Sequence, residues 1–311
     1  MIVPAGQRCR FWVVTAGFGL LIAMGAQAQN RGVYPLGMSA TNSGVTPGAG
    51  FTYVNQLLYY SRDHAKDDAG NTLSVTGEHY VLMDMNTLAW VSTQHFLGGA
   101  AFSAVATLPF ARNSLTSDIK GNISGGGGFA DSYYIPFILG WNGERFSIRT
   151  MYGFLAPTGR FVANASNNVG SGYWTHALSS GQTFYLNSNK QLVLSAFQMY
   201  EFHTTQEGTG IHPGQTFDLD YSLLRALPVL KGFQVQIGLI GYEQRQTRAK
   251  NGPGISAIAS VERYAVNSVG FAVNSAFPKH KASLGVKYFK EFSNRSTFQG
   301  YSLQFSGSIT L

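Results

Sequence analysis

Charged residues are scarce in this sequence: Asp, Glu, Lys and Arg together make up 12% of its 311 residues. Soluble domains have roughly twice that share. Long apolar runs are lacking too, because no stretch reaches the ~18 residues that a membrane-spanning helix needs, and the mean hydropathy is −0.02. The composition therefore excludes a bundle of membrane helices and is unusual for a soluble domain.

The N-terminal residues have the features of an export signal. Arg8 and Arg10 precede an apolar stretch at residues 11–24, and the triplet AQA at 26–28 places small residues where a signal peptidase reads them. Residues 1–28 are therefore predicted to be a cleaved signal peptide. The alternative is a membrane anchor, but a helix of that length spans only about 21 Å of a hydrocarbon core of about 30 Å.

Cysteine chemistry is excluded from the exported chain, since the only cysteine, Cys9, leaves with the predicted signal peptide. Disulfides, thiol nucleophiles and cysteine-bound metals therefore play no part. The basic residues behind the formal net charge of +7 are scattered rather than clustered. We accordingly expect no nucleic-acid partner.

Glycine and aromatic residues are abundant, with 37 Gly, 22 Phe, 16 Tyr and 4 Trp. From about residue 50 onward, segments rich in Val, Ile, Leu, Phe and Tyr are separated by turn residues. Several alternate apolar with polar residues, as 217–223 (FDLDYSL) does, which is the period of a β-strand. The apolar face points inward in a soluble sandwich and outward in an outer-membrane barrel, so the period alone leaves both folds open.

The lengths of the connectors favour the barrel. Long polar connectors, as near 62–77 and 112–130, alternate with short ones, as near 93–98 and 142–144. Outer-membrane barrels show this asymmetry between extracellular loops and periplasmic turns, and their strand number is even. We therefore predict an all-β protein: a transmembrane antiparallel β-barrel of about 12 strands over residues 50–311, preceded by the cleaved signal peptide.

The segment at residues 29–49 shows no strand pattern and contains Gly, Ser and Pro. We expect it to be a periplasmic N-terminal segment that acts as a tether. Folding of this segment into the lumen is the alternative.

Charged residues within the strands are expected to face the lumen, because an arginine on the lipid face costs ~2–4 kcal/mol at the midplane. Candidates for a lumenal constriction carry both signs: Arg145, Arg149, Asp218, Asp220, Lys287 and Glu291. One interpretation is that these charges pair with one another and fill a narrow barrel. The other is that some of them select solutes by charge.

One long loop offers a second candidate site. Pro157 and Gly159 can end strand pairing and let the chain leave the wall. We expect the loop that follows to fold inward and narrow the channel, with Tyr173 and Trp174 as a stacking surface.

Signals for catalysis are weak. The seven histidines show no H-x-x-x-H or H-E-x-x-H spacing, and neither G-x-S-x-G nor G-x-x-x-x-G-K-[ST] occurs. We predict no catalytic residue, no metal site and no cofactor. Two alternatives stay open: Glu201 and His203 have the spacing of one strand face and could bind a metal, and a Ser–His arrangement could assemble on the barrel exterior, as in outer-membrane phospholipases.

Several strings give the chain a family resemblance. In order along the sequence they are YVN (53–55), LGWN (139–142), APTGRF (156–161), NVGSGYWT (168–175), GYEQRQ (241–246) and KYFKEF (287–292). With these strings the chain resembles the MetA-pathway of phenol degradation family of outer-membrane β-barrel transporters, over nearly the whole mature sequence. No catalytic residue can be carried over from this family.

The resemblance implies a protein in the outer membrane of a Gram-negative bacterium that takes up aromatic or other hydrophobic compounds. The expected function is a channel for passive uptake of small hydrophobic or aromatic compounds. Its expected partners are outer-membrane lipid, the solute and the barrel assembly machinery. The alternative is a closed outer-membrane barrel that acts as a structural or surface-interaction protein.

Overall fold

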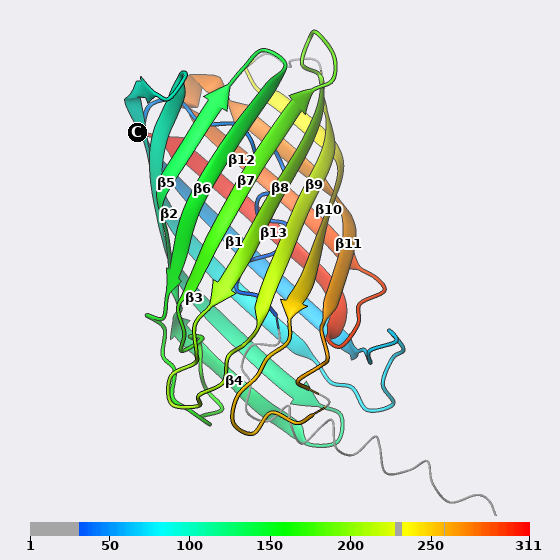
Figure 1. The fold of residues 1–311 in the computed structure, drawn as a ribbon. Coiled ribbons are helices and arrows are strands. Elements are labelled where there is room, and N and C mark those ends of the chain that lie inside the picture. The colour runs from blue at the N-terminus through cyan, green and yellow to red at the C-terminus, as the bar shows by residue number, and fades with distance from the viewer. Residues whose placement is uncertain (1–30, 228–231, 258) are drawn as a thin grey trace, which may run out of the picture.

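The computed structural model describes residues 31–227, 232–257 and 259–311, which fold into one closed wall of antiparallel strands (Figure 1). The predicted signal peptide, residues 1–28, lies outside the described residues. In chain order the strands are β1 (Gly50–Ala65), β2 (His79–Phe96), β3 (Ala100–Ser117), β4 (Gly121–Phe129), β5 (Ser132–Asn142), β6 (Phe146–Ala156), β7 (Thr175–Tyr185), β8 (Leu192–His203), β9 (Gln215–Ala226), β10 (Gln234–Arg248), β11 (Ala265–Phe277), β12 (Ala282–Glu291) and β13 (Phe298–Thr310).

Twelve of these strands close the ring, and β4 extends it at one place. β1 pairs with both β2 and β13, and pairing continues around the ring until β5 meets β3 and β3 meets β2. In β3, residues 101–107 pair with β5, whereas residues 110–117 pair with β4. The strands β3 and β4 thus form a hairpin that continues past the end of β5. The predicted all-β barrel is confirmed, with 12 strands in the ring.

Side chains alternate between the outer surface and the lumen along each strand, as the pleat of a strand requires. On β9, Asp218 and Asp220 are fully buried inside the ring, while their neighbour Leu223 is exposed on the outside. Large apolar side chains are exposed on the outer surface, among them Phe110, Leu239, Phe271, Leu284 and Phe305. A closed wall with an apolar exterior leaves no backbone group unpaired against lipid.

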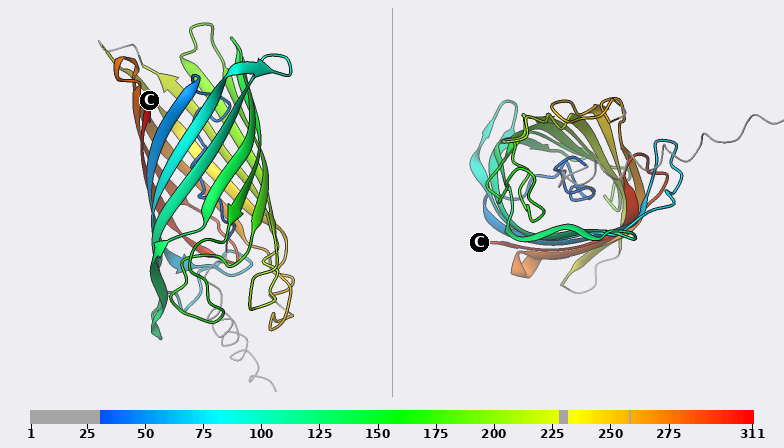
Figure 2. Two further views of the ribbon diagram at one scale, coloured as in Figure 1. Left: turned by 90° about the vertical axis from the view of Figure 1, so that its left-hand side faces the viewer. Right: turned by 90° about the horizontal axis from the view of Figure 1, so that it is seen from below.

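The two ends of the barrel differ in their connectors (Figure 2). Short turns lie at the end where β1 begins, and one of them holds the single 3-10 turn of the described residues, η2 (Pro278–His280). Long connectors, including residues 157–174 and 249–264, lie at the opposite end. The alternation expected from the sequence is present. Among the described residues, no helix is long and apolar enough to cross a membrane.

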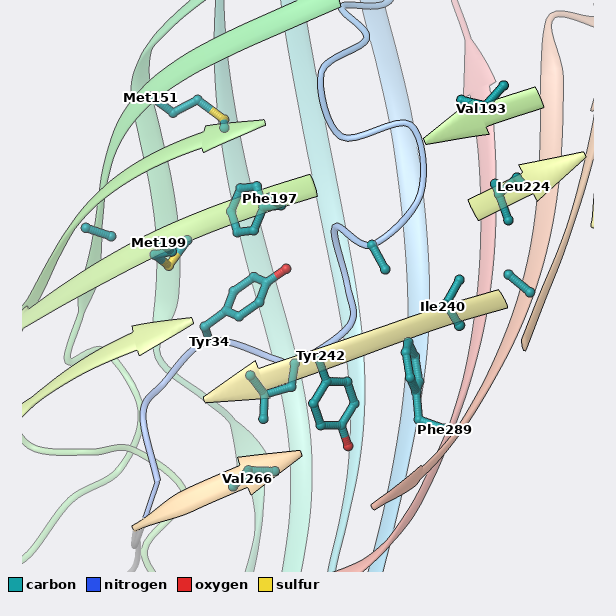
Figure 3. Close-up of a cluster of buried hydrophobic side chains, with 14 of the residues drawn as sticks. Tyr34, Met151, Val193, Phe197, Met199, Leu224, Ile240, Tyr242, Val266 and Phe289 are labelled. Carbon is teal, nitrogen blue, oxygen red and sulfur yellow. The ribbon is translucent and has the colours of Figure 1, made fainter. Parts of the chain in front are cut away.

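Part of the lumen is filled by a hydrophobic cluster. Figure 3 shows Tyr34, which lies on the N-terminal segment, with its ring stacked on that of Phe197 at 5.4 Å between centroids. Tyr242 of β10 and Phe289 of β12 form a second ring pair at 4.8 Å. The cluster joins the N-terminal segment to the wall, so the segment is part of the folded core.

Candidate functional site in the lumen

Residues 31–46 run lengthwise through the barrel. At the long-loop end the Arg31 side chain donates to the hydroxyl of Thr297 at 3.2 Å. At the short-turn end the backbone N–H of Thr46 donates to the side chain of Asn142 at 3.1 Å. The expectation of a tether is therefore wrong for these residues, and the alternative, folding into the lumen, is what the structure shows. We call residues 31–46 the lumenal segment.

The carboxylate of Glu201 on β8 holds the start of the lumenal segment. It accepts hydrogen bonds from the backbone N–H groups of Val33 at 3.1 Å and Tyr34 at 2.7 Å. The hydroxyl of Thr216 also donates to it at 2.5 Å, and His203 Nε2 lies 3.4 Å away. Charge-assisted bonds of this kind are about twice as strong as neutral ones, so Glu201 fixes the position of the chain here.

Asp220 on β9 holds the next turn of the segment. It accepts from the Tyr34 hydroxyl at 2.5 Å and from the backbone N–H groups of Gly37 at 3.0 Å and Ser39 at 3.1 Å. Lys287 Nζ on β12 donates to the carbonyl of Gly37 at 2.9 Å and to the following carbonyl at 2.6 Å. Asp220 thus binds the backbone N–H groups of this short stretch, and Lys287 binds its carbonyl groups.

Gly37 is required at this turn for two reasons. Its φ of +82° lies in the left-handed region, which side chains with a Cβ rarely adopt. A Cβ there would also stand 2.4 Å from the ring of Phe289. The wall therefore fits this residue closely.

Glu291 on β12 binds the first described residue of the segment. It accepts from Arg31 Nη1 at 2.7 Å and Nη2 at 3.1 Å, in the two-pronged geometry that suits a guanidinium. The Tyr242 hydroxyl at 3.0 Å, the Asn294 amide at 2.9 Å and the Gly300 N–H at 3.1 Å also donate to it. Glu291 is thus fully hydrogen-bonded, with a side chain that is 1% exposed.

Arg62 on β1 makes a weaker contact with the same carboxylate. Its Nε lies 3.4 Å from Glu291 Oε1, and its guanidinium carbon lies 4.6 Å from the centre of the Tyr60 ring. The side chain is buried. Two guanidinium groups therefore share one carboxylate at the long-loop end of the lumen.

The other residues predicted to form a constriction have three different surroundings. Arg149 donates through Nε and Nη2 to the carbonyl of Ser43 in the lumenal segment, at 2.8 Å and 2.6 Å. Asp218 accepts from the amide of its neighbour Gln244 at 2.6 Å. Arg145 is exposed in the turn between β5 and β6, so the expectation that it faces the lumen does not hold.

The structure therefore brings Arg149, Asp220, Lys287 and Glu291 together through the segment that they bind. Neither sequence interpretation anticipated this arrangement. The charges serve chiefly to hold a piece of the same chain inside the barrel, because the segment supplies the backbone donors and acceptors that they need.

The two loop aromatics point in different directions. Tyr173 is buried, with its ring edge-on to His203 at 5.2 Å. Trp174 is 45% exposed and lies 5.9 Å from Phe154, an outward residue of β6. They do not form a joint stacking surface, because the ring of Tyr173 is buried beside His203 while that of Trp174 is exposed beside Phe154.

A neighbouring part of this loop does reach the lumen. Asp131, between β4 and β5, accepts from the N–H groups of Gly159 at 2.9 Å and Ser171 at 2.7 Å and so ties the loop to the wall. Burial raises the pKa of the Asp131 carboxyl, although these donors oppose the shift. The loop is thereby placed so that residues 168–170 line a cavity.

This cavity has a volume of about 220 Å³ and lies beside the lumenal segment, where residues of β2 and β3 make up much of its lining. Its apolar lining includes Leu36, Met38, Val81, Met83, Met85 and Met199. A cavity of about 150 Å³ with apolar walls is enough to bind benzene. The space thus suits a molecule with a single ring, and the flexible thioethers let its shape adapt.

Polar groups lie at the long-loop end of the cavity, where Arg31, Arg62 and His79 contribute to its lining. The cavity therefore has an apolar body and a basic end. It extends from the long-loop side, marked by Thr297 and Phe298, inward to Met38.

Sequence reasoning missed several of these residues. Tyr34 belongs to a segment without periodicity, so nothing marked it as an anchor. The sequence suggests Glu201 only as a partner of His203 in a metal site, whereas its carboxylate binds the lumenal segment. The signal that could have found it is the placement of a buried acid on the lumenal face of a strand.

Comparison with known proteins identifies the family of the chain. The family model described as "Putative MetA-pathway of phenol degradation" matches residues 62–306. The chain belongs to this family. The phenol-degradation family resemblance seen in the sequence strings is thereby confirmed, and no curated protein sequence matches the chain.

Solved structures of outer-membrane barrels resemble this member of the phenol-degradation family. An outer membrane channel from Pseudomonas putida F1 matches with a TM-score of 0.72 at 14% identity, over 87% of this chain and 98% of that chain. The β-domain of the Bordetella autotransporter BrkA has a TM-score of 0.53 at 11% identity, over 85% and 100%. The translocator domain of NalP from Neisseria meningitidis has a TM-score of 0.50 at 10% identity, over 88% and 92%.

These matches show the fold of a Gram-negative outer-membrane barrel, as the sequence predicted. A barrel of this kind contacts membrane lipid with its apolar exterior.

Proposed function

We propose that the protein is an outer-membrane channel for the passive uptake of small hydrophobic or aromatic compounds. The observation that carries this proposal is the apolar cavity beside the lumenal segment. Its volume of about 220 Å³ and its lining by Met38, Met83 and Met85 suit one small apolar molecule. A water-filled pore for ions or sugars would instead have a polar lining.

In this proposal the cavity is the outer part of the route and the lumenal segment is its inner barrier. The cavity reaches from the long-loop end to Met38, beyond which the chain continues through the lumen to Thr46. A solute bound in the cavity reaches the other end only when the segment shifts. Uptake is then the diffusion of a bound solute past a movable barrier, with no energy source required.

The second candidate function is a closed barrel that serves as a structural or surface-interaction protein. One observation favours it, namely the dense bonding of the lumenal segment to Glu201, Asp220 and Glu291. A segment held this firmly could be permanent filling. The cavity weighs against this reading, because a purely structural filling has no need of apolar space next to it.

The remaining features of the proposal concern how the chain reaches its place. Residues 1–28 act as a cleaved signal peptide, residues 29–49 are the N-terminal segment, and residues 50–311 form the transmembrane barrel. The barrel assembly machinery inserts it into the outer membrane. The solute and outer-membrane lipid are its other partners.

The test is to fill the cavity. Ala111 lines it from β3, and Ala111→Phe places a ring where the solute would lie. Ala106→Phe, on the outward face of the same strand, is the matched control. Entry of radiolabelled toluene is measured in intact cells, where the lipopolysaccharide leaflet is the barrier that slows apolar solutes.

We expect wild type and Ala106→Phe to speed toluene entry several-fold over cells without the protein, and Ala111→Phe to lose most of that gain. Equal entry in cells with and without the wild-type protein would remove the channel proposal and leave the structural one. Heat-modifiable gel migration checks that each variant is folded.

A further inference from the structure

The basic end of the cavity holds more positive charge than its acid can balance. Arg31 and Arg62 both face Glu291, and the two ion-pair contacts are 2.7 Å and 3.4 Å. One carboxylate against two guanidinium groups leaves a charge of one unit. An arginine stays protonated in proteins, so this excess cannot be removed by losing a proton.

Glu291 does not need Arg62. Its oxygens already accept two bonds from Arg31 and one each from Tyr242, Asn294 and Gly300. The Arg62 contact is the longest of the set, at 3.4 Å, and uses only Nε. The hydrogen-bonding capacity of Glu291 is therefore satisfied without Arg62.

The two terminal nitrogens of Arg62 have no hydrogen-bond partner among the described residues, although the side chain is only 7% exposed. One face of the guanidinium is covered by the Tyr60 ring, at 4.6 Å. Arg62 also lines the cavity. A buried cation with open donors at the end of an apolar cavity is costly unless an anion completes it.

The other ionisable groups of the cavity do not fill this role. Glu201 is occupied by the segment's N–H groups, Thr216 and His203, and Asp131 by the loop. Within the described chain, Glu291 is the one acid within 4.0 Å of Arg62. His79, which also lines the cavity, adds no negative charge.

We propose that the cavity binds small amphipathic anions, namely organic carboxylates with one apolar ring or a short chain. The carboxylate pairs with the open edge of the Arg62 guanidinium, which presents two parallel donors to such a group. The apolar body lies against Met83 and Met85. This inference rests on the proposed function and narrows its solute class from hydrophobic compounds in general to acids.

The experiment compares two probes of nearly equal shape, benzoate and benzamide, of which only the first is an anion. Their binding to the full mature protein in lipid nanodiscs is measured by titration calorimetry. Wild type should bind benzoate at least about tenfold more tightly than benzamide, as expected for a hydrogen-bonded charge pair. Arg62→Met should remove this difference and leave benzamide binding unchanged.

Arg112→Met is the matched control, because Arg112 is exposed on the adjoining strand β3 and does not line the cavity; it should preserve the preference. Arg62→Lys should keep part of it, since the charge remains and the planar fork is lost. Equal binding of benzoate and benzamide by wild type would overturn the inference, and this measurement needs no variant.

Ala111→Phe separates this outcome from failure of the proposed function. If it abolishes binding of both probes, the cavity is the site and only the charge preference is in question. Binding of both probes that Ala111→Phe leaves unchanged would place them elsewhere and overturn the inference together with the cavity proposal.

Discussion

The two sides of the lumen treat the lumenal segment differently. The side formed by β8, β9 and β12 binds it with Glu201, Asp220, Lys287 and Glu291. The side formed by β2 and β3 meets it with apolar side chains such as Met83 and leaves a cavity. The lumenal segment is thus hydrogen-bonded to one side of the wall and makes apolar contacts with the other, toward which it can move.

The comparison shows that different interactions hold the lumenal segment in place and allow it to move. Hydrogen bonds to buried charges have a fixed geometry and are expensive to break. Contacts with thioethers depend on volume rather than direction. A solute that enters on the apolar side therefore competes with few oriented bonds.

The largest effect is expected from removing the segment altogether. Deletion of residues 31–46 empties the lumen that these residues fill, because their bonds run from Thr297 at one end to Asn142 at the other. Single-channel conductance in planar bilayers should rise several-fold. A folded deletion variant with the conductance of wild type would show that the segment does not restrict the path.

A single change on the anchoring side should cost the most stability. Glu291→Gln leaves Arg31 and Arg62 without their carboxylate, and breaking a buried pair from one side costs about 3–5 kcal/mol. Urea unfolding in lipid vesicles measures the loss. The matched control is Glu243→Gln, which breaks an ion pair with Arg245 at 3.0 Å where both side chains are more than a third exposed; it should cost about 1 kcal/mol or less.

A milder change on the same side should alter the movement of the segment more than the fold. Tyr34→Phe deletes the hydroxyl that donates to Asp220 and accepts from the N–H of Ser39, at a cost of about 1–3 kcal/mol. Brief openings in single-channel recordings should become more frequent.

The comparison for this variant is Tyr53→Phe, which removes an exposed hydroxyl bonded to Asn86 at 2.6 Å. It lies outside the lumen and should leave the openings as they are. Equal opening frequencies in both variants would contradict an anchoring role for Tyr34.

The smallest effect belongs to Arg145. Arg145→Gln changes an exposed residue of a short turn, and surface substitutions of this kind usually fall within ±0.5 kcal/mol. Ion selectivity from reversal potentials should not change. A clear shift in the reversal potential would show that Arg145 acts on the ion path in the lumen, contrary to its position in the turn.

The strands were predictable because the alternation of apolar and polar residues, as in 217–223, indicates both a strand and the side to which each residue points. The predictions fail where this alternation ends. Arg145 shares the phase of Arg149, yet β6 begins one residue later, at Phe146, so the turn exposes it. Tyr173 and Trp174 lie in the loop before β7, where no strand period fixes the direction of a side chain.

The place of the lumenal segment could not be predicted from its own residues. It is bound mainly through backbone groups, as in the bonds from Val33 and Gly37 to wall carboxylates. Because nearly every residue has the same backbone groups, such bonds cannot be inferred from residue identity. The wall charges were visible, but their partner was not. Charged residues on the lumenal faces of strands thus indicate that a segment of the same chain without strand periodicity can be bound there.

The order of events during folding follows from where the anchors lie along the chain. The Arg31 guanidinium reaches Glu291, 260 positions later, and the Leu36 carbonyl is held by Gln304, 268 positions later. These bonds form only when β12 and β13 are in place, and contacts between distant positions are slow to form. Docking of the segment is therefore a late step, and an immature barrel still lacking these strands cannot yet be closed by it.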